Sequence, residues 1–413
     1  MVLKKSVVAE FVLIILLLSL FLLIRFLHFR ESLNFSLDQS VWSSRALAIY
    51  RNREVTLVGP EYSLNVQGRR IFQGPFTYYL LILFLVPFKF NPVSASYLFT
   101  IFAGFATIPL FFGTKFLLGK KGAVLISIAY VLFPLFVDHS RFLWNGNFLL
   151  SLSVFTIFFL GLFYKTNKSL FLIPSFFIAG LSVQLHYLFL IVCALLFVFL
   201  FLIKRLNVRI FSISVFAVLL GSFPQILFEL RNNFYTFRTL LIYVKNYQQV
   251  IAGGSIASHY LLVILPFALL FTAFFLRRKI NQQVIAATIL ILSTLDIFLY
   301  LPMPEHGFGM SENWGYPEEE KVYETIRSQN LTNYNIANLV YDTKATAQKY
   351  LHQKDGVIIE NGNYETNKYL FVISKDLENF NNFPYEVKYF FPFKVNGVWQ
   401  INESYELFLL ERL

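Results

Sequence analysis

The feature that most constrains this chain is a series of long apolar stretches separated by short basic clusters. A helix needs about 20 apolar residues to cross the roughly 30 Å hydrocarbon core of a bilayer. We predict such spans at residues 7–27, 93–117, 122–138, 148–164, 169–185, 187–203, 210–228, 259–276 and 282–301. Only 14% of the residues are charged, whereas a soluble domain has about a quarter. The sequence therefore predicts a polytopic α-helical membrane protein with about nine spans.

The basic clusters give these spans an orientation. They are Lys4 with Lys5, Lys120 with Lys121, Lys204 with Arg205, and Arg277 to Lys279. Lysine and arginine favour cytoplasmic loops, which predicts a cytoplasmic N-terminus. The run Pro75 to Phe88 has only 14 residues, so we interpret it as a re-entrant or interfacial segment. If that run crossed the membrane, the later spans would invert.

The basic residues also account for the net charge of +11, because they follow the loop pattern of a membrane protein. We therefore expect membrane lipid as a partner and no nucleic acid. Cys193 is the only cysteine, so no intrachain disulfide can form.

The composition changes abruptly near Pro302, which predicts two domains. Residues 1–301 form the transmembrane domain, with an outer loop at 29–74, and residues 302–413 form a small soluble α/β domain on the outer side. In the second domain we predict a helix opening at Glu318, a helix at Thr343–Leu351, strands at Asn335–Tyr341, Val357–Glu360 and Tyr369–Ser374, and an edge strand at Val398–Glu411. Alternating strands and helices are typical of α/β folds.

Polar side chains gather on the outer side of this topology. Such groups are costly at membrane depth, so their positions indicate function. The candidates are Asp38, Gln39, Gln73, Arg141, Asn145, Gln184, His186, Glu229 and Arg231. Structural explanations stay open for several of them. Asp38 can cap a helix, Gly74 and Pro75 can form a turn, and Arg141 can anchor a span at the headgroups.

Several short motifs occur in order along these segments. They are Phe35-Ser-Leu-Asp-Gln39, Leu57-Val-Gly-Pro60, the Gly74–Leu80 element, Ser140-Arg-Phe-Leu-Trp-Asn-Gly-Asn147, Gln184-Leu-His-Tyr187 and Phe228-Glu-Leu-Arg231. In this order the chain resembles the family 39 membrane glycosyltransferases of the GT-C fold. That group includes lipid A aminoarabinose transferases, protein O-mannosyltransferases and galacturonosyl transferases. The resemblance covers about residues 7–235.

The resemblance implies an inverting glycosyltransferase that takes its sugar from a polyprenyl-phosphate donor. The acceptor would be a hydroxyl of a glycan, lipid or protein, and Asp38 would act as the general base. Arg141, Arg231 and His186 would bind the donor phosphate, because cationic forks suit a phosphate leaving group. The substrate-positioning candidates are Gln39, Gln73, Asn145, Gln184 and Glu229. No catalytic metal or other cofactor is expected.

The chain departs from this family at three places. Many relatives have Asp-Glu where this chain has Asp38 and Gln39. The aminoarabinose transferases have an aspartate near the position of Asn145, and Lys-Pro at the position of Gly74 and Pro75. These differences leave the sugar and the acceptor open.

Two other functions remain to be weighed. A transporter or flippase of a lipid-linked saccharide would commonly show repeated halves, and no internal repeat is evident. An oligosaccharide ligase or polymerase would use a lipid diphosphate donor, and the chain lacks a long arginine-rich outer loop late in its sequence.

Overall fold

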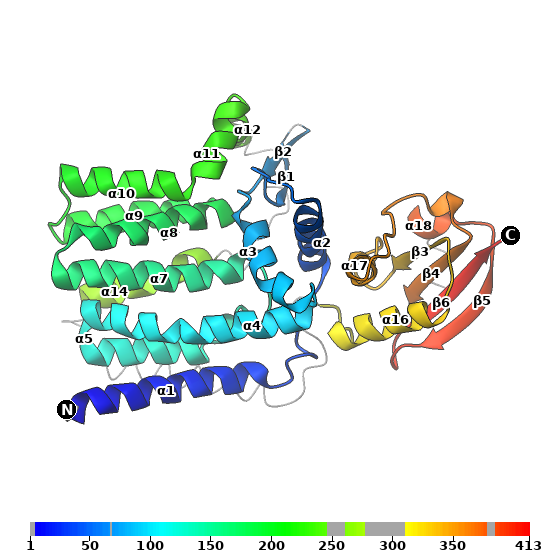
Figure 1. Ribbon diagram of the computed structural model, residues 1–413, viewed down its shortest axis with the longest axis horizontal. Helices are drawn as coiled ribbons and strands as arrows, with labels where there is room; N and C mark the ends of the chain where they lie inside the picture. The colour runs from blue at the N-terminus through cyan, green and yellow to red at the C-terminus, as the bar shows by residue number, and fades with distance from the viewer. Residues whose placement is uncertain (1–4, 67, 246–260, 277–309, 378–384) are drawn as a thin grey trace. The chain divides into compact units, whose positions relative to one another are not determined.

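The computed structural model describes residues 5–66, 68–245, 261–276, 310–377 and 385–413 (Figure 1). The chain divides into two compact units. The helical unit comprises residues 1–27, 53–83 and 96–301, and the α/β unit comprises 28–52, 84–95 and 302–413. The predicted span at 282–301 lies outside the described residues.

The helical unit consists mainly of apolar helices that pack side by side (Figure 1). The unit also contains an antiparallel hairpin of β1 (Glu61–Val66) and β2 (Arg69–Phe72), which lies at one end of the stacked helices (Figure 1). The helices are α1 (Lys5–Phe26), α3 (Phe76–Leu85), α4 (Pro92–Phe105, of which the first turn belongs to the α/β unit), α5 (Thr107–Leu132), α6 (Pro134–Asp138), α7 (Asn145–Thr166), α8 (Leu172–Leu185), α9 (Phe189–Leu202), α10 (Val208–Gly221), α11 (Phe223–Arg231), α12 (Tyr235–Lys245) and α14 (Leu261–Leu276). Short 3-10 turns lie at Val86–Phe88 and Ser169–Phe171.

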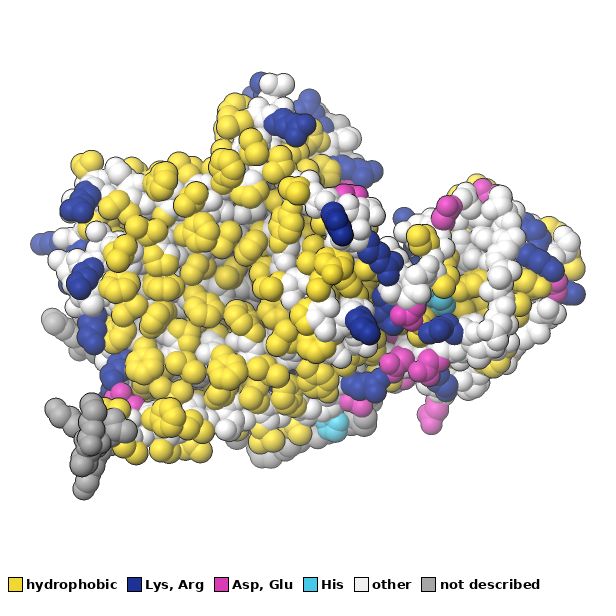
Figure 2. All heavy atoms as spheres, in the orientation of Figure 1, with side chains coloured by type: hydrophobic (Ala, Val, Ile, Leu, Met, Phe, Trp, Pro, Cys, Tyr) yellow, Lys and Arg dark blue, Asp and Glu magenta, His cyan; other side chains and the backbone are white. Residues whose placement is uncertain are grey.

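Three described helical stretches are long and apolar enough to cross a membrane: Val7–Phe26, Pro92–Leu132 and Asn145–Thr166. A fourth results if α10 and α11, bent by 72°, count as one span. Hydrophobic side chains cover most of the visible face of the helical unit (Figure 2), and Phe11 on α1 is 65% exposed. Apolar exposure on this scale marks a lipid-facing surface. The chain is an integral membrane protein, while the count of nine spans stays a prediction.

The stretch Pro92–Leu132 contains a chain reversal. Gly119 leaves the helical conformation (φ 81°, ψ 178°). The Tyr130 hydroxyl donates a hydrogen bond to the carbonyl of Ala103 at 2.9 Å, although a straight helix would separate residues so far apart by about 40 Å. Two arms therefore lie side by side, with Lys120 and Lys121 directly after the break. This agrees with separate predicted segments at 93–117 and 122–138, although the second helix ends at Leu132.

The α/β unit is built on a four-stranded sheet of order β3-β4-β6-β5. Its strands are β3 (Tyr334–Asn338), β4 (Tyr369–Ser374), β5 (Phe393–Gln400) and β6 (Glu406–Arg412), and its helices are α2 (Leu37–Asn52), α16 (Tyr316–Ser328), α17 (Thr346–Lys354) and α18 (Tyr385–Lys388), with a 3-10 turn at Tyr364–Thr366. β3 and β4 are parallel, and α17 lies between them in the chain, whereas β4–β6 and β6–β5 are antiparallel. The predicted small α/β fold is confirmed.

Two strand predictions in this unit are wrong. Val357–Glu360 forms no strand; its apolar residues stand largely exposed instead of pairing with the sheet. The tail forms two strands, and β6 lies inside the sheet rather than at its edge. Leu407 and Leu409 pack in one hydrophobic cluster and Phe408 and Leu410 in another. Because alternate side chains are buried on both faces, β6 takes a central position.

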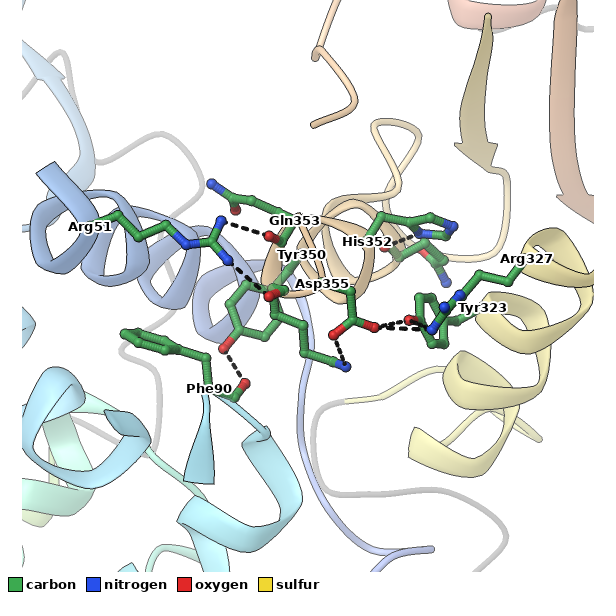
Figure 3. Close-up of polar contacts among 10 residues, drawn as sticks. Arg51, Phe90, Tyr323, Arg327, Tyr350, His352, Gln353 and Asp355 are labelled. Atoms are coloured by element: carbon green, nitrogen blue, oxygen red, sulfur yellow. Dashed lines mark hydrogen bonds and ion pairs between the residues drawn. The ribbon is translucent and has the colours of Figure 1, made fainter. Parts of the chain in front are cut away.

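The helix that carries Asp38, α2, packs against α17. The hydroxyls of Ser40 and Thr346 are 2.7 Å apart. The Arg51 guanidinium donates to the carbonyls of Gln353 and Lys354, each at 2.9 Å (Figure 3). Part of the predicted outer loop 29–74 thus belongs to the same compact unit as residues 302–413.

Candidate functional site

Three predicted polar residues meet in the helical unit. Asn145 begins α7, and its Nδ2 donates to Gln73 Oε1 and to the Leu185 carbonyl, both at 3.2 Å. Gln184, in the last turn of α8, donates from Nε2 to the carbonyl of Gly221 at 2.6 Å. Gln73, Asn145 and Gln184 are all buried. The cluster therefore joins the end of β2 to the ends of α7, α8 and α10.

Two Gly-Pro segments complete this cluster through close backbone approach. The amide of Gly74 donates to the Gln184 carbonyl at 2.8 Å. A Cβ at Gly74 would lie 2.6 Å from the Cβ of Gln184, and one at Gly59 would lie 1.9 Å from the Gly74 carbonyl oxygen. No side chain fits at such distances. A turn alone therefore does not account for Gly74, because the packing also excludes a Cβ.

A ring of contacts around Tyr187 fixes the hairpin beside the cluster. The Tyr187 hydroxyl donates to the Phe72 carbonyl at 2.6 Å, and the Tyr187 amide donates to the Tyr62 hydroxyl at 3.2 Å. The Tyr62 ring stacks on Tyr187 and meets the His186 ring edge-on, each at 5.6 Å between centroids. His186 Nδ1 accepts from the amide of Leu188 at 3.2 Å. Sequence reasoning gave His186 a role, named Tyr187 only as the end of a motif and missed Tyr62.

The arginines of the helical unit differ in how they are held. Arg141 is buried, and its guanidinium donates to the carbonyl of Leu27, just after α1. Arg25 is fully buried and donates to Ser140 Oγ at 2.6 Å and to the Val131 carbonyl at 2.7 Å. Sequence reasoning missed Arg25, although an arginine inside the apolar run 7–27 was the available signal. Arg25 fixes the segment that precedes Arg141.

Glu229 and Arg231 lie at the end of α11. The two carboxylate oxygens of Glu229 accept from the amides of Thr236 and Phe237, at 3.2 and 3.3 Å. Glu229 thereby caps the first turn of α12. Arg231 is the exposed last residue of α11. Within the part of the chain that the structure describes, neither side chain hydrogen-bonds to Gln73, Asn145 or Gln184.

Asp38 and Gln39 lie in the first turn of α2, in the α/β unit. Gln39 is buried, and its Oε1 accepts from the amide and the hydroxyl of Ser36, at 3.2 and 2.9 Å. This is half of a capping box. Ser36, directly before the helix, therefore takes the capping position, and Asp38 is not the cap residue. Asp38 itself is exposed.

The geometry thus groups Gln73, Asn145 and Gln184 in the helical unit. Asp38 and Gln39 belong to the other compact unit. Within the described residues, no three His, Cys, Asp or Glu side chains lie close enough together to hold a metal ion. What the helical cluster offers chemically is a set of fixed side-chain amides, with His186 two residues after Gln184. Such amides bind and orient polar ligand groups.

Comparison with known proteins identifies the fold. The chain is similar to ArnT from Cupriavidus metallidurans in the apo state, with TM-score 0.59 and 9% identity over 97% of this chain and 98% of that chain. It is also similar to ArnT from the same organism bound to undecaprenyl phosphate, with TM-score 0.55 and 10% identity over 96% and 97%. An oligosaccharyltransferase from Archaeoglobus fulgidus matches with TM-score 0.38 and 12% identity over 77% of this chain and 43% of that chain.

No protein-family model and no curated protein matches the sequence. The likeness to ArnT extends over nearly the whole of both chains. The chain therefore has the GT-C fold of ArnT, as the motif order predicted.

Proposed function

We propose that this chain transfers a sugar from a polyprenyl-phosphate donor to an acceptor hydroxyl of a glycan, lipid or protein. The observation that carries the proposal is the likeness to ArnT, which extends along nearly the full length of this chain and of ArnT. One of the two ArnT structures is bound to undecaprenyl phosphate. Reaction takes place on the outer face of a bacterial cell membrane, with the N-terminus in the cytoplasm and residues 302–413 outside.

The proposed reaction is a single displacement. The acceptor oxygen bonds to the anomeric carbon while the bond from that carbon to the phosphate oxygen breaks, so the sugar is inverted. Asp38 takes the proton of the acceptor hydroxyl, and polyprenyl phosphate leaves. Asp38 suits this role because it is exposed and lies at the N-terminal end of α2, where the helix dipole favours an ionised carboxylate.

The other candidates divide into binding and positioning roles. Arg141, Arg231 and His186 stabilise the phosphate charge that grows as the bond breaks. Gln73, Asn145 and Gln184 orient substrate. Gln39 and Glu229 act through the backbone, because their carbonyl and carboxylate oxygens hold the first turns of α2 and α12.

The test is transfer of radiolabelled sugar by the purified chain in lipid nanodiscs, from a panel of polyprenyl-phosphate sugars to added acceptors. Asp38→Asn should lower the rate by about 10²–10⁴-fold, the usual contribution of general base catalysis. Glu324→Gln, an exposed change on α16, is the control and should leave the rate unchanged. The thermal midpoint of Asp38→Asn should stay near that of the wild type, because Ser36 and Gln39 still cap α2.

Other outcomes of the same assay would favour the alternatives. Normal transfer by Asp38→Asn would eliminate Asp38 as the base. Movement of labelled lipid-linked saccharide across the bilayer without transfer would indicate a transporter. Transfer only from lipid diphosphate donors would indicate a ligase or polymerase.

A further inference from the structure

A pocket of about 670 Å³ opens in the α/β unit. Its lining comes from the end of α16, the start of β3, the end of α17 and the segment 357–367. Small-molecule sites commonly have volumes of about 300–1,000 Å³. The lining is rich in side-chain amides, namely Asn330, Asn333, Asn335, Asn363 and Asn367.

The amides on one side of this pocket are held by one another. Asn335 is buried, and its Nδ2 donates to the Gly362 carbonyl at 2.9 Å and to Asn367 Oδ1 at 3.2 Å. Asn367 in turn donates from Nδ2 to Asn333 Oδ1 at 3.1 Å. This chain of hydrogen bonds fixes the amide orientations before any ligand arrives, which lowers the entropy cost of binding.

Local backbone conformation accounts for some of these asparagines. Asn330, Asn333 and Asn363 have φ of 51°, 56° and 61°, a left-handed conformation in which asparagine is enriched. Asn335 lies in β3, and Asn367 has φ of −77°, so neither needs asparagine for its backbone. These two asparagines are therefore explained by the hydrogen bonds that link the side-chain amides.

The pocket also contains a buried acceptor without a partner. His352 lines it and is only 1% exposed. Its Nδ1 lies 2.8 Å from the carbonyl of Gln348; a carbonyl only accepts, so Nδ1 carries the proton and Nε2 is an acceptor. Nε2 has no hydrogen-bond partner among the described residues. Burial lowers the pKa of His352, so the ring is neutral near pH 7 and Nε2 remains an acceptor.

The charges at the pocket are already paired. Arg327 donates to the Tyr323 hydroxyl at 2.9 Å and forms an ion pair with Asp355 at 3.3 Å (Figure 3). Glu360 accepts a hydrogen bond from Asn363. An anionic ligand would therefore meet no unpaired cation, and a phosphate or carboxylate would leave Nε2 of His352 without a donor. A ligand whose hydroxyls both donate and accept satisfies the amides and the imidazole together.

We infer that this pocket binds a neutral saccharide. The asparagine amides exchange hydrogen bonds with its hydroxyls, Nε2 of His352 accepts from one of them, and the ring of Tyr334 offers a face to its apolar side. The inference stands apart from the proposed transfer reaction, because it concerns binding alone and requires neither Asp38 nor a lipid donor.

The experiment measures binding with no donor present. The fluorescently labelled full chain in nanodiscs is applied to an array of neutral hexose and N-acetylhexosamine oligosaccharides, together with phosphorylated and uronic acid counterparts. Affinity for the strongest neutral hit is then measured by calorimetry. The wild type should bind at least one neutral glycan and should not prefer the charged counterparts.

The matched variants change asparagines whose backbone has a positive φ. Asn333→Gly with Asn363→Gly removes two amides and keeps a residue that tolerates positive φ. We expect affinity to fall by about tenfold or more, since the ligand loses its hydrogen bonds to two side-chain amides. Asn313→Gly is the control, because Asn313 has φ of 55° and does not line the pocket; its affinity should match that of the wild type.

His352→Phe provides an independent variant, because it keeps an aromatic ring and removes Nε2. It should also weaken binding, with a thermal midpoint close to that of the wild type. The proposal is overturned if no neutral glycan binds, if only phosphorylated or uronic acid sugars bind, or if the double asparagine variant binds as tightly as Asn313→Gly. Loss of sugar transfer in Asp38→Asn has no bearing on any of these outcomes.

Discussion

The helical unit and the α/β unit each bury an ionisable side chain, and each unit stabilises it in a different way. In the helical unit, Arg25 is fully buried and directs its N–H groups at a hydroxyl and at backbone carbonyls where α5 ends. In the α/β unit, Glu319 is fully buried and accepts from Trp314 Nε1 at 2.6 Å and from Tyr341 and Gln348.

The difference follows from what each group does when it loses water. A guanidinium keeps its proton in proteins, so Arg25 stays charged and depends on acceptors that are already in place. A buried carboxyl is able to take up a proton instead, and burial raises the pKa of Glu319 to about 8. The helical unit therefore holds Arg25 through acceptors that are already in place, and the α/β unit has a buried carboxyl that titrates.

The largest effect is expected at Arg25. Arg25→Met keeps an unbranched side chain but leaves Ser140 and several carbonyls at the end of α5 without their donor. Each buried unsatisfied group costs about 1–3 kcal/mol, so the thermal midpoint should fall by roughly 5–10 °C. Arg209→Met, at an exposed position on α10, is the control and should stay near the wild type. Thermal unfolding of both variants is followed by tryptophan fluorescence. Equal midpoints for the two variants would show that Arg25 contributes no stability.

The same contrast explains what the sequence allowed us to predict. In the helical unit, lipid permits polar groups mainly at helix ends, so position along the chain identified Gln73, Asn145 and Gln184. The reversal at Gly119 followed from the basic pair after it. The residues that sequence reasoning left out, Arg25 and Tyr62, act through partners that only the packed structure reveals.

In the α/β unit, contacts between distant segments determined which residues form strands and in what order the strands lie. Val357–Glu360 has the composition of a strand, yet it lies beside the amide chain of Asn335 and pairs with no strand. The position of β6 inside the sheet depends on clusters on both faces. The packing of α2 on α17 joins segments about 300 residues apart, as in the contact of Ser40 with Thr346. Local patterns do not contain such information.

The second effect tests the titrating contact. Because the folded pKa of Glu319 lies above its value of 4.5 in the unfolded chain, its contribution to stability is complete below about pH 4.5 and is lost as pH rises toward 8. The free energy of unfolding should fall by up to ~1.4 kcal/mol per pH unit in this interval. Glu319→Gln should flatten that slope in thermal melts from pH 5 to 8, and Glu324→Gln, exposed on the same helix, should not. A slope unchanged in Glu319→Gln would assign the pH dependence to other groups.

The smallest effect concerns the contact between α2 and α17, which matters because α2 carries Asp38. Arg51→Gln removes the two hydrogen bonds to the carbonyls of Gln353 and Lys354. These bonds are exposed, so their loss should cost about 1 kcal/mol and lower sugar transfer by up to roughly fivefold. Hydrogen exchange should accelerate in residues 37–52 and stay unchanged in β4.

Lys344→Gln, an exposed change just before α17, is the control for this variant. Faster exchange in α2 together with slower transfer would mean that residues 302–413 support catalysis by holding the helix of the proposed base. Faster exchange with normal transfer would mean that the position of α2 does not depend on α17 during the reaction, and the role of this packing would then be stability alone.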